Sequence, residues 1–335
     1  NCLAGLDSYE RRVRKMKKNR TAILKHLCAC ALTITMAFVV PSAGYAAGTD
    51  TLGFGAGGPG TNVDAYGNPV SGVVAKGITV SKYQYRASAV SGGIDWDTVK
   101  KSGVSFAMIR LGYYNDLDPN YAENMKGALA AGLKTGIFFY TQALDVDTAR
   151  AEADFVLSQI KDYPISYPVA YDVESDTILQ NGLTKQQITE QVKAFCERIA
   201  AAGYRPIVYA NNEWLNNHLD MTQLPYDIWY ARYGTVNEYP NRTIWQCTDH
   251  GEVPGIGGNV TVEYAFVDYG TLIPSDGWKQ VGNDWYYVKN YIHQTGWLTV
   301  GDKTYYLGAD GKMVHDITVN LDGKDYTFGS DGALQ

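Results

Sequence analysis

Short apolar runs alternate with amphipathic stretches over roughly residues 77–269 of the 335-residue chain. Runs rich in β-branched and aromatic residues are typical of strands, and apolar positions spaced three or four apart are typical of helices. The runs predict strands at Val104–Arg110, Thr135–Tyr140, Pro168–Glu174 and Arg205–Ala210. The amphipathic stretches predict helices at Asp95–Lys101, Tyr121–Ala131 and Thr148–Lys161, and a fourth that follows Thr184.

This fourth helix has the clearest boundaries. Thr184 and Gln187 have the spacing of a capping box, in which each side chain bonds the backbone N–H of the other residue. Gly203 follows the last apolar position, and glycine readily adopts the left-handed conformation that ends a helix. The buried face is expected to consist of Ile188, Val192, Phe195 and Ile199.

Strands and helices that alternate at this period predict parallel strands joined by crossover helices, in a doubly wound sheet or a barrel. Three later strands leave little room for helices between them: Asp227–Ala231, Thr243–Cys247 and Val260–Phe266. The chain therefore predicts an α/β fold, an irregular TIM-like barrel of about five βα units closed by three further strands. In such barrels the functional residues gather at the carboxyl ends of the strands.

The first 46 residues predict a signal peptide. A basic stretch precedes an apolar run from Leu27 to Val40, and small residues follow it, so we expect cleavage after Ala46. The run is short for a membrane anchor, so the mature protein is expected to be secreted, without membrane attachment. Met16 is a candidate start, which would make residues 1–15 an over-extended reading frame. Residues 47–75 are glycine-rich without apolar periodicity and predict a flexible leader.

Charge and cysteine content narrow the possible ligands. Residues 1–46 hold eight of the 29 basic and two of the 35 acidic residues, so the formal charge is −12 without them and −6 with them. Such an acidic chain is not expected to bind nucleic acid through charge. Three of the five cysteines also lie in residues 1–46, which leaves Cys196 and Cys247 in the predicted mature chain. These two do not cluster with the five histidines, so we expect no metal and no cofactor. Cys196 lies in a helical pattern and is predicted to be a buried free thiol rather than half of a disulfide.

Aromatic residues and glycines recur in the C-terminal segment, residues 276–335. Gly277–Tyr287 resembles Gly296–Tyr306, and Thr304–Met313 resembles Asp325–Leu334. Units of this size cannot bury their aromatic residues alone, so neighbouring units are expected to stack. The pattern predicts a small module of β-hairpin repeats after a barrel domain of residues 76–272.

Two acids end the predicted strand Pro168–Glu174. Side chains alternate faces along a strand, so Asp172 and Glu174 are expected on one face, and Tyr167, Tyr171 and Val173 on the other. Positions two apart are separated by about 6.6 Å, close enough for two carboxylates to act on one bond and shift each other's pKa. Glycoside hydrolysis uses one protonated acid at the leaving oxygen and one ionised acid beside the developing positive charge. The alternative is a strand end with two solvated acids.

Further motifs stand in order along the predicted barrel: Gly77–Gln84, Gly93–Val99, Phe106–Gly112, Asp118–Tyr121, Asp227–Tyr233, Trp245–Gln246 and Val253–Val260. Together with Asp172 and Glu174 they resemble the landmarks of glycoside hydrolase family 25, over about residues 76–270. Members of this family are lysozyme-type muramidases. The C-terminal repeats are similar to the choline-binding and glucan-binding wall repeats that often accompany such enzymes.

The resemblance implies a secreted, cell-wall-associated enzyme of a Gram-positive-type bacterium. It would cleave the β-1,4 bond between N-acetylmuramic acid and N-acetylglucosamine in peptidoglycan. Glu174 would be the general acid, and Asp172 would steady a cyclic intermediate formed by the sugar's own acetamido group. The spacing of the two acids leaves both retention and inversion open, because side-chain torsions move the carboxyl oxygens by several ångströms.

Thr79 and Thr261 depart from the family pattern, which usually has acids at these positions in the sugar cleft. Their lower negative charge is expected to weaken the upward shift in the pKa of Glu174. Glu263 has the same strand parity as Thr261 and is a candidate replacement for the missing acid. The departure supports an alternative function, a catalytically weak or inactive wall-binding or adhesion protein on a decayed hydrolase barrel.

Other residues at predicted strand ends are candidates for contact with the substrate. Thr79 and Thr261 occupy cleft positions, and Arg110 either contacts the substrate or holds Asp172 ionised. About half of the aromatic residues at these ends are expected to stack on sugar rings, and the others to pack in the core. The aromatic candidates are Tyr140, Tyr209, Trp229, Tyr230 and Trp245.

The wall repeats are expected to hold their ligand between aromatic rings. Such rings attract a quaternary ammonium group and equally stack on glucose, so choline-bearing teichoic acid and a glucan both remain possible partners beside peptidoglycan. Ile317 stands where the other repeats have Gly-Trp, so at most one or two complete sites are expected. The candidate ligand residues are Trp278, Trp285, Tyr286, Trp297, Tyr305 and Tyr306.

Overall fold

The computed structural model describes residues 62–64, 67–87, 93–114, 116–234, 239 and 241–335. The predicted signal peptide and residues 47–61 of the predicted leader lie outside these ranges. The rest of the leader contacts the barrel: the backbone N–H of Val74 donates to the carbonyl of Ala265 (2.8 Å), and Val70 is buried. Val63 and Pro69 form a β-bridge. This part of the chain is folded against the barrel, which differs from the flexible leader predicted there.

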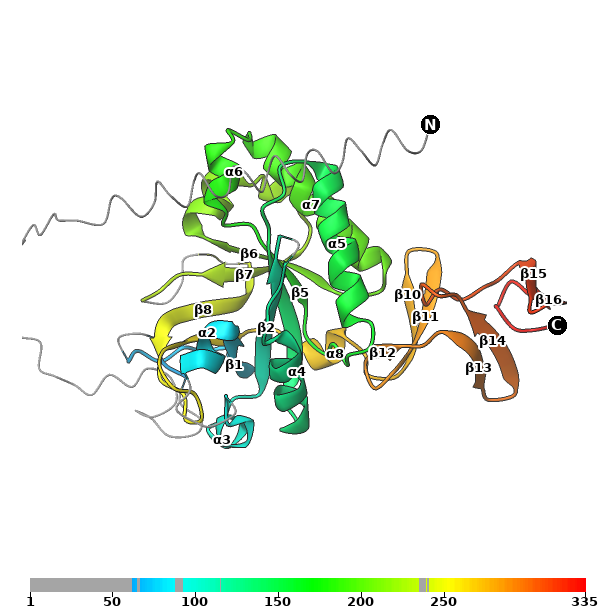
Figure 1. Cartoon of the computed structure of the whole chain (residues 1–335), viewed down its shortest axis with the longest axis horizontal. Coiled ribbons are helices and arrows are strands. Elements are labelled where there is room, and N and C mark those ends of the chain that lie inside the picture. The colour runs from blue at the N-terminus through cyan, green and yellow to red at the C-terminus, as the bar shows by residue number, and fades with distance from the viewer. Residues whose placement is uncertain (1–61, 65–66, 88–92, 115, 235–238, 240) are drawn as a thin grey trace, which may run out of the picture. The chain divides into compact units, whose positions relative to one another are not determined.

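In the described part of the chain, eight strands form a closed barrel (Figure 1). They are β1 (Ala75–Val80), β2 (Phe106–Tyr113), β4 (Lys134–Tyr140), β5 (Val169–Asp172), β6 (Pro206–Asn211), β7 (Asp227–Ala231), β8 (Arg242–Gly251) and β9 (Val260–Ala265). A short strand, β3 (Asp116–Leu117), pairs with the end of β2.

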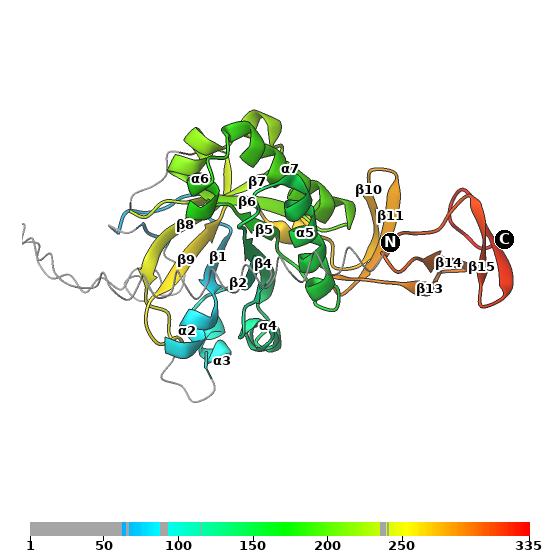
Figure 2. The ribbon, with the colours of Figure 1, turned by 45° about the horizontal axis from the view of Figure 1, so that its top comes forward.

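Closure of the barrel depends on β1, which pairs with both β2 and β9. Figure 2 shows these three strands side by side. Apart from the short β3, which is antiparallel to β2, the strands from β1 to β8 are parallel, and β9 runs antiparallel to both of its neighbours. The predicted barrel of βα units closed by further strands is confirmed.

Helices connect the earlier strands. They are α2 (Lys82–Ala87), α3 (Trp96–Lys101), α4 (Tyr121–Ala130), α5 (Val146–Ile160), α6 (Asp176–Gln180), α7 (Lys185–Ala201) and α8 (Tyr269–Leu272), with short helical turns η1 (Trp214–His218) and η2 (Met221–Gln223). Helix α7 has the predicted capping box of Thr184 and Gln187, and all four predicted apolar positions on it are buried. Within the described residues, no helix has both the length and the apolar character needed to cross a membrane.

Two apolar clusters fill the barrel domain. The interior cluster includes Ala170, and the outer cluster, between strands and helices, includes Val169 and Tyr171. Tyr171 stacks on Phe195 of α7 with ring centroids 3.9 Å apart. Tyr167, predicted on the outer face, belongs to the interior cluster because it precedes β5 and does not share its alternation.

The C-terminal segment forms the predicted hairpins. The first contains β10 (Gly277–Val281), β11 (Asp284–Lys289) and β12 (Ile292–His293); the others are β13 (Gly296–Val300) with β14 (Lys303–Leu307), and β15 (Ile317–Leu321) with β16 (Lys324–Phe328). Their small core contains Tyr305, Leu307 and Met313, and the surrounding aromatic residues are only partly buried.

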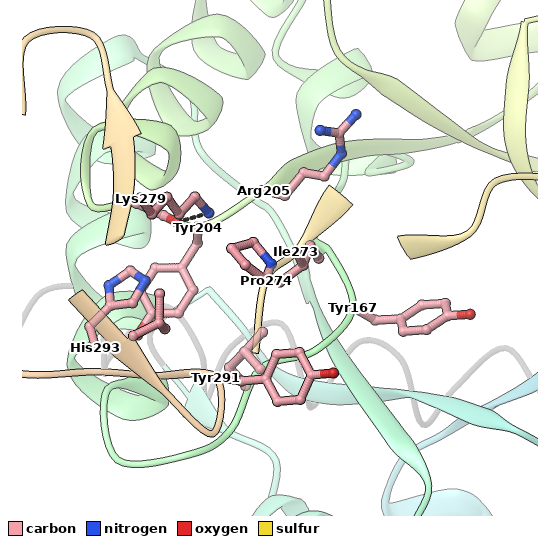
Figure 3. Close-up of a pocket in the computed structure, with 11 residues that line it drawn as sticks. Tyr167, Tyr204, Arg205, Ile273, Pro274, Lys279, Tyr291 and His293 are labelled. Atoms are coloured by element: carbon pink, nitrogen blue, oxygen red, sulfur yellow. Dashed lines mark hydrogen bonds between the residues drawn. The ribbon is translucent and has the colours of Figure 1, made fainter. Parts of the chain in front are cut away.

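The first hairpin packs on the C-terminal end of α7, as Figure 3 shows around Lys279, Tyr204 and His293. The ammonium group of Lys279 donates to the carbonyl of Gly203, and the His293 ring stacks on Tyr204 at 4.5 Å. Burial lowers the pKa of Lys279 to about 8 and that of His293 to about 4. The carbonyl of Gly203 lies just beyond the end of α7, so Lys279 satisfies a backbone group that would otherwise face the hairpin unpaired.

Candidate active site

Asp172 and Glu174, here called the acid pair, lie at the carboxyl end of β5. Strand β5 ends at Asp172, two residues earlier than predicted, so a bend in the chain positions Glu174 and strand alternation does not. The backbone N–H of Glu174 donates to Asp172 Oδ1 (3.2 Å), and the backbone N–H of Asn211 donates to Glu174 Oε1. Asp172 is 8% exposed and Glu174 is half-buried, so Glu174 is the more accessible acid.

Burial changes the proton affinity of both acids. It raises the pKa of Glu174 to about 7, against the lowering effect of the Asn211 N–H. Burial and the charge of Glu174 raise the pKa of Asp172 well above its usual range. The two acids influence each other's proton affinity, because the charge of Glu174 is one cause of the raised pKa of Asp172. The pKa of Glu174 is raised even though threonine, and not an acid, stands at positions 79 and 261, because burial is the largest cause of the shift.

Arg110 forms an ion pair with Asp118. Its Nη2 and Nε atoms lie 2.6 and 2.8 Å from Asp118 Oδ2, and its guanidinium lies over the Tyr83 ring at 5.1 Å. The positive charge of Arg110 lowers the pKa of Asp172, although not enough to overcome burial. Arg110 thus pairs with Asp118 and not with Asp172 in this structure, and its contact with the substrate stays a prediction.

Glu263 lies inside the barrel with its carboxyl fully buried. It accepts hydrogen bonds from Thr79 Oγ1 (2.7 Å), Trp229 Nε1 (2.8 Å) and Gln246 Nε2 (3.0 Å). Thr261 Oγ1 donates to the backbone carbonyl of Thr79 (3.4 Å). Thr79 and Trp229, predicted as substrate contacts, are therefore engaged by Glu263 within the barrel.

Two of the predicted aromatic residues do lie beside the acid pair. The Tyr140 hydroxyl donates to the backbone carbonyl of Glu174 (3.1 Å). Tyr209, the register partner of Asp172 on β6, donates its hydroxyl to Gln246 Oε1 (3.0 Å). The hydroxyl of Tyr233, a half-exposed residue, donates to the same oxygen (2.9 Å).

Trp245 and Tyr230 cannot contact a sugar in this structure. Both are fully buried in the outer cluster, and the Trp245 indole donates to the carbonyl of Arg232 (2.8 Å). The sequence placed them at strand ends but could not tell on which side of the barrel wall they lie.

The candidate set from the sequence missed Gln246 and Tyr233. Both stand in the motifs quoted above, and Gln246 is a polar residue in the otherwise apolar strand segment Ile244–Cys247. A buried amide needs hydrogen-bond partners, so this position was a detectable signal of a polar network inside the barrel.

Aromatic residues of the repeats form two clusters. In the first, the Trp278 ring meets Trp285, Tyr287 and Tyr305 edge-to-face, with centroid distances of 6.5, 5.1 and 4.8 Å. Tyr287 was not predicted as a ligand residue. The edge-to-face contacts hold the rings at angles to one another, as in a cage.

In the second cluster, Trp297 contacts Tyr306, Tyr326 and Phe328 at 5.2, 4.8 and 6.0 Å. Tyr326 was not predicted as a ligand residue, and whether either cluster is a ligand site stays a prediction. Tyr286 belongs to neither cluster: it is fully buried, and its hydroxyl donates to the carbonyl of Ala201 at the end of α7. Strand alternation turns it toward the barrel, so its prediction as a ligand residue was wrong.

The model of the family described as glycosyl hydrolases family 25 matches residues 78–256, more than half of the chain. The chain belongs to glycosyl hydrolase family 25. A second model, described as a putative cell wall binding repeat, matches residues 276–290 and 295–313. The family 25 match covers the acid pair and most of the barrel, and the repeat match covers the first two hairpins.

Two of the curated relatives of this family 25 chain are named lysozymes. It is 28% identical over 178 residues to the autolytic lysozyme of Clostridium acetobutylicum, a match covering 51% of this chain and 52% of the relative. It is 27% identical over 202 residues to lysozyme M1 of Streptomyces globisporus, covering 55% and 65%. The chain thus spans between half and two thirds of the length of these relatives.

Solved structures share the fold of the barrel. The modular autolysin LytC of Streptococcus pneumoniae, solved with a synthetic peptidoglycan ligand, superposes with a TM-score of 0.54 at 24% identity, covering 61% of this chain and 49% of that one. A family 25 glycosyl hydrolase from Bacillus anthracis superposes with a TM-score of 0.51 at 20% identity, covering 59% and 92%. At these identities the likeness concerns the fold alone.

Proposed function

We propose that the protein is a peptidoglycan hydrolase that cleaves the β-1,4 bond between N-acetylmuramic acid and N-acetylglucosamine. The observation that carries the proposal is the acid pair, a buried Asp172 and a half-buried Glu174 at the carboxyl end of a barrel strand, both with a raised pKa. The chain's membership of family 25 and its similarity to two lysozymes support a glycan as the substrate.

Glu174 is the general acid in this proposal. It is the more accessible of the two acids, and its pKa of about 7 keeps it largely protonated in mildly acidic solution. A protonated carboxyl can donate to the departing glycosidic oxygen, whereas an ordinary glutamate would already be ionised.

Asp172 assists from deeper in the barrel. A hydrogen bond from the substrate's acetamido N–H would favour the ionised form of Asp172, and Glu174 would then be the protonated acid of the pair. The ionised aspartate would then stabilise the positive charge that develops when the acetamido oxygen attacks the anomeric carbon. Such substrate-assisted hydrolysis is a known exception to the scheme with a carboxylate nucleophile. Tyr140 and Tyr209, which lie beside the acid pair, are candidates for contact with the sugar.

The repeats attach the enzyme to the wall in this proposal. The faces of the Trp278 and Trp297 clusters are suited to the quaternary ammonium of choline or to a glucose ring. The similarity to cell-wall-binding repeats favours choline on teichoic acid as the ligand. Wall attachment also requires export, as the predicted signal peptide provides.

Clearing of purified peptidoglycan tests the activity. Wild type should clear the suspension, Glu174→Gln should not, and Glu123→Gln, at an exposed position on α4, serves as the matched control. Mass spectrometry of the fragments should show muramic acid at the new reducing end; glucosamine there would indicate a glucosaminidase. Equal clearing by wild type and Glu174→Gln would remove the enzymatic assignment and favour the wall-binding alternative.

Retention of the full chain on choline and glucan resins tests the role of the repeats. Elution by free choline would identify the ligand of the two aromatic clusters. Retention on the glucan resin alone would replace choline with glucose units, and retention on neither resin would overturn the binding role.

A further inference from the structure

Glu263 is a buried acid whose hydrogen-bond donors lie outside the acid pair. Its carboxyl is 0% exposed, and Thr79, Trp229 and Gln246 all donate hydrogen bonds to it. These three donors come from β1, β7 and β8, so one carboxyl joins three strands across the barrel interior. Burial of an acid costs free energy unless hydrogen bonds compensate, so the three donors must keep their hydrogens directed at Glu263.

The first consequence concerns the orientation of Gln246. Its Nε2 donates to Glu263, so its carbonyl oxygen lies on the opposite side of the amide. Burial raises the pKa of Glu263 to about 7, so its charge alone does not fix the amide. The reverse orientation would place the Gln246 oxygen against Glu263 Oε1, which already accepts a hydrogen bond from Thr79 Oγ1, and the two oxygens would meet with no hydrogen between them. Glu263 therefore fixes which end of the Gln246 amide faces the active site.

The second consequence concerns two tyrosine hydroxyls. Tyr209 and Tyr233 both donate to the Gln246 oxygen, at 3.0 and 2.9 Å. A hydroxyl has one hydrogen, so these two are committed to Gln246 and only their oxygen lone pairs remain for other groups. Tyr209 is the register partner of Asp172, and the charges of Asp172 and Glu174 both act on it.

We propose that Glu263 is a positioning residue: through Gln246 it turns the hydroxyl hydrogens of Tyr209 and Tyr233 away from the acid pair. The site then presents two oxygen acceptors, suited to a hydroxyl or an amide N–H of the substrate, and withholds donors from Asp172 and Glu174. This inference rests on the proposed function, in which a proton must stay on the acid pair. Hydrogen bonds donated to either carboxylate would favour loss of that proton.

The test compares wild type, Glu263→Gln, Tyr209→Phe and the double variant, all as the full chain. Glutamine at position 263 places an N–H group where Gln246 now donates, so the side-chain amide of Gln246 should turn round. Its NH2 group would then face Tyr209 and Tyr233, whose hydroxyl hydrogens would be free to point toward the acid pair. The pKa of Glu174, followed by 13C NMR of labelled glutamate carboxyls and assigned with Glu174→Gln, should fall by roughly half to one unit, the equivalent of one hydrogen bond. The pH above which wall clearing declines should fall by the same amount.

The Tyr209→Phe background decides whether the effect passes through the hydroxyl. The shift caused by Glu263→Gln should fall by more than half there, whereas loss of the Glu263 charge alone would give the same shift with and without that hydroxyl. An equal shift in both backgrounds, or an unchanged pKa in Glu263→Gln, overturns the proposal.

Two further variants separate positioning from stability. Glu152 is an equally buried acid that accepts hydroxyl hydrogen bonds from Thr141 and Tyr171 on the outer side of β5, so Glu152→Gln should lower the melting temperature without a Tyr209-dependent shift. If Glu263→Gln does not fold, Gln246→Met frees the same hydroxyls and should lower the pKa of Glu174; no shift in that variant overturns the proposal. The NMR titration needs no turnover, so it remains decisive even if failure of wild type to clear peptidoglycan overturns the proposed function.

Discussion

The barrel and the repeat module use aromatic residues in opposite ways. In the barrel, Trp229, Trp245 and Tyr230 are almost completely buried, although each stands at a strand end where a sugar contact was expected. In the repeats, Trp297 is 46% exposed, and Trp278 is only partly buried although it packs against the small core.

The difference follows from the number of layers. Each barrel strand has an interior cluster on one side and a helix or loop layer on the other, so both faces of the wall bury large side chains. The five-residue strands of the β13–β14 hairpin pack against the neighbouring hairpins through Tyr305 and Trp297, but so small a unit leaves part of each ring in solvent. The same residue type therefore supports stability in the barrel and is available for ligand binding in the repeats.

The largest effect expected from this comparison is on stability. Trp245→Ala should reduce the free energy of unfolding of the barrel by about 3–5 kcal/mol, because it opens a cavity in a closely packed cluster. Trp297→Ala should cost less than about 1 kcal/mol, because half of that ring is already in solvent. Denaturant unfolding followed by circular dichroism measures both.

Retention on choline or glucan resin should show the reverse order. Trp297→Ala should weaken retention, whereas the part of Trp245→Ala that remains folded should be retained like wild type. Equal stability losses in the two variants would contradict the layered explanation.

Burial of acids makes the free energy of unfolding of the barrel depend on pH near neutrality. Burial raises the pKa of Glu152 from an ordinary 4.5 to about 7, so the folded state holds a proton that the unfolded state releases in this window. Its stabilising contribution is complete below about pH 4.5 and is lost as the pH rises through 7.

Glutamine does not titrate in this pH range, so the Glu152→Gln variant lacks this contribution to the pH dependence of stability. Melting temperatures recorded from pH 4 to 8 should therefore decline less steeply in Glu152→Gln than in wild type. Parallel curves for the two proteins would show that Glu152 is not protonated by folding.

The smallest effect concerns the boundary between the two regions. Tyr286→Phe removes the hydroxyl that donates to the Ala201 carbonyl at the end of α7, and should cost about 1 kcal/mol, as for a typical hydrogen bond. Differential scanning calorimetry should show a small decrease in melting temperature, with wall retention unchanged because Tyr286 lies in neither aromatic cluster. A large loss of retention would return Tyr286 to the ligand site.

Local patterns in the sequence were enough to predict most of the elements. The capping box of Thr184 and Gln187 and the apolar face of α7 appear as expected, because both depend on residues within a few positions of one another. The short helices α2 and α6 were not predicted, since each has only one or two turns and no sustained apolar period. Cys196 is a buried free thiol, as predicted from its helical context.

The candidate site was predicted less completely. Tyr140 and Tyr209 lie beside the acid pair, whereas Trp229 and Trp245 are packed within the domain. Alternation along a strand tells which residues share a face, but it does not tell how deep in the barrel each one lies.

The amino-acid pattern was enough to predict the alternating βα plan, the hairpin repeats and the position of Asp172 at a strand end, because these follow from short-range periodicity. The convergence of Thr79, Trp229 and Gln246 on Glu263, and the packing of Tyr286 on α7, became visible only in the folded molecule. These contacts join residues far apart in the chain, and closure of the barrel is what brings their strands together. Long-range closure also determines burial, and through burial the pKa of each acid.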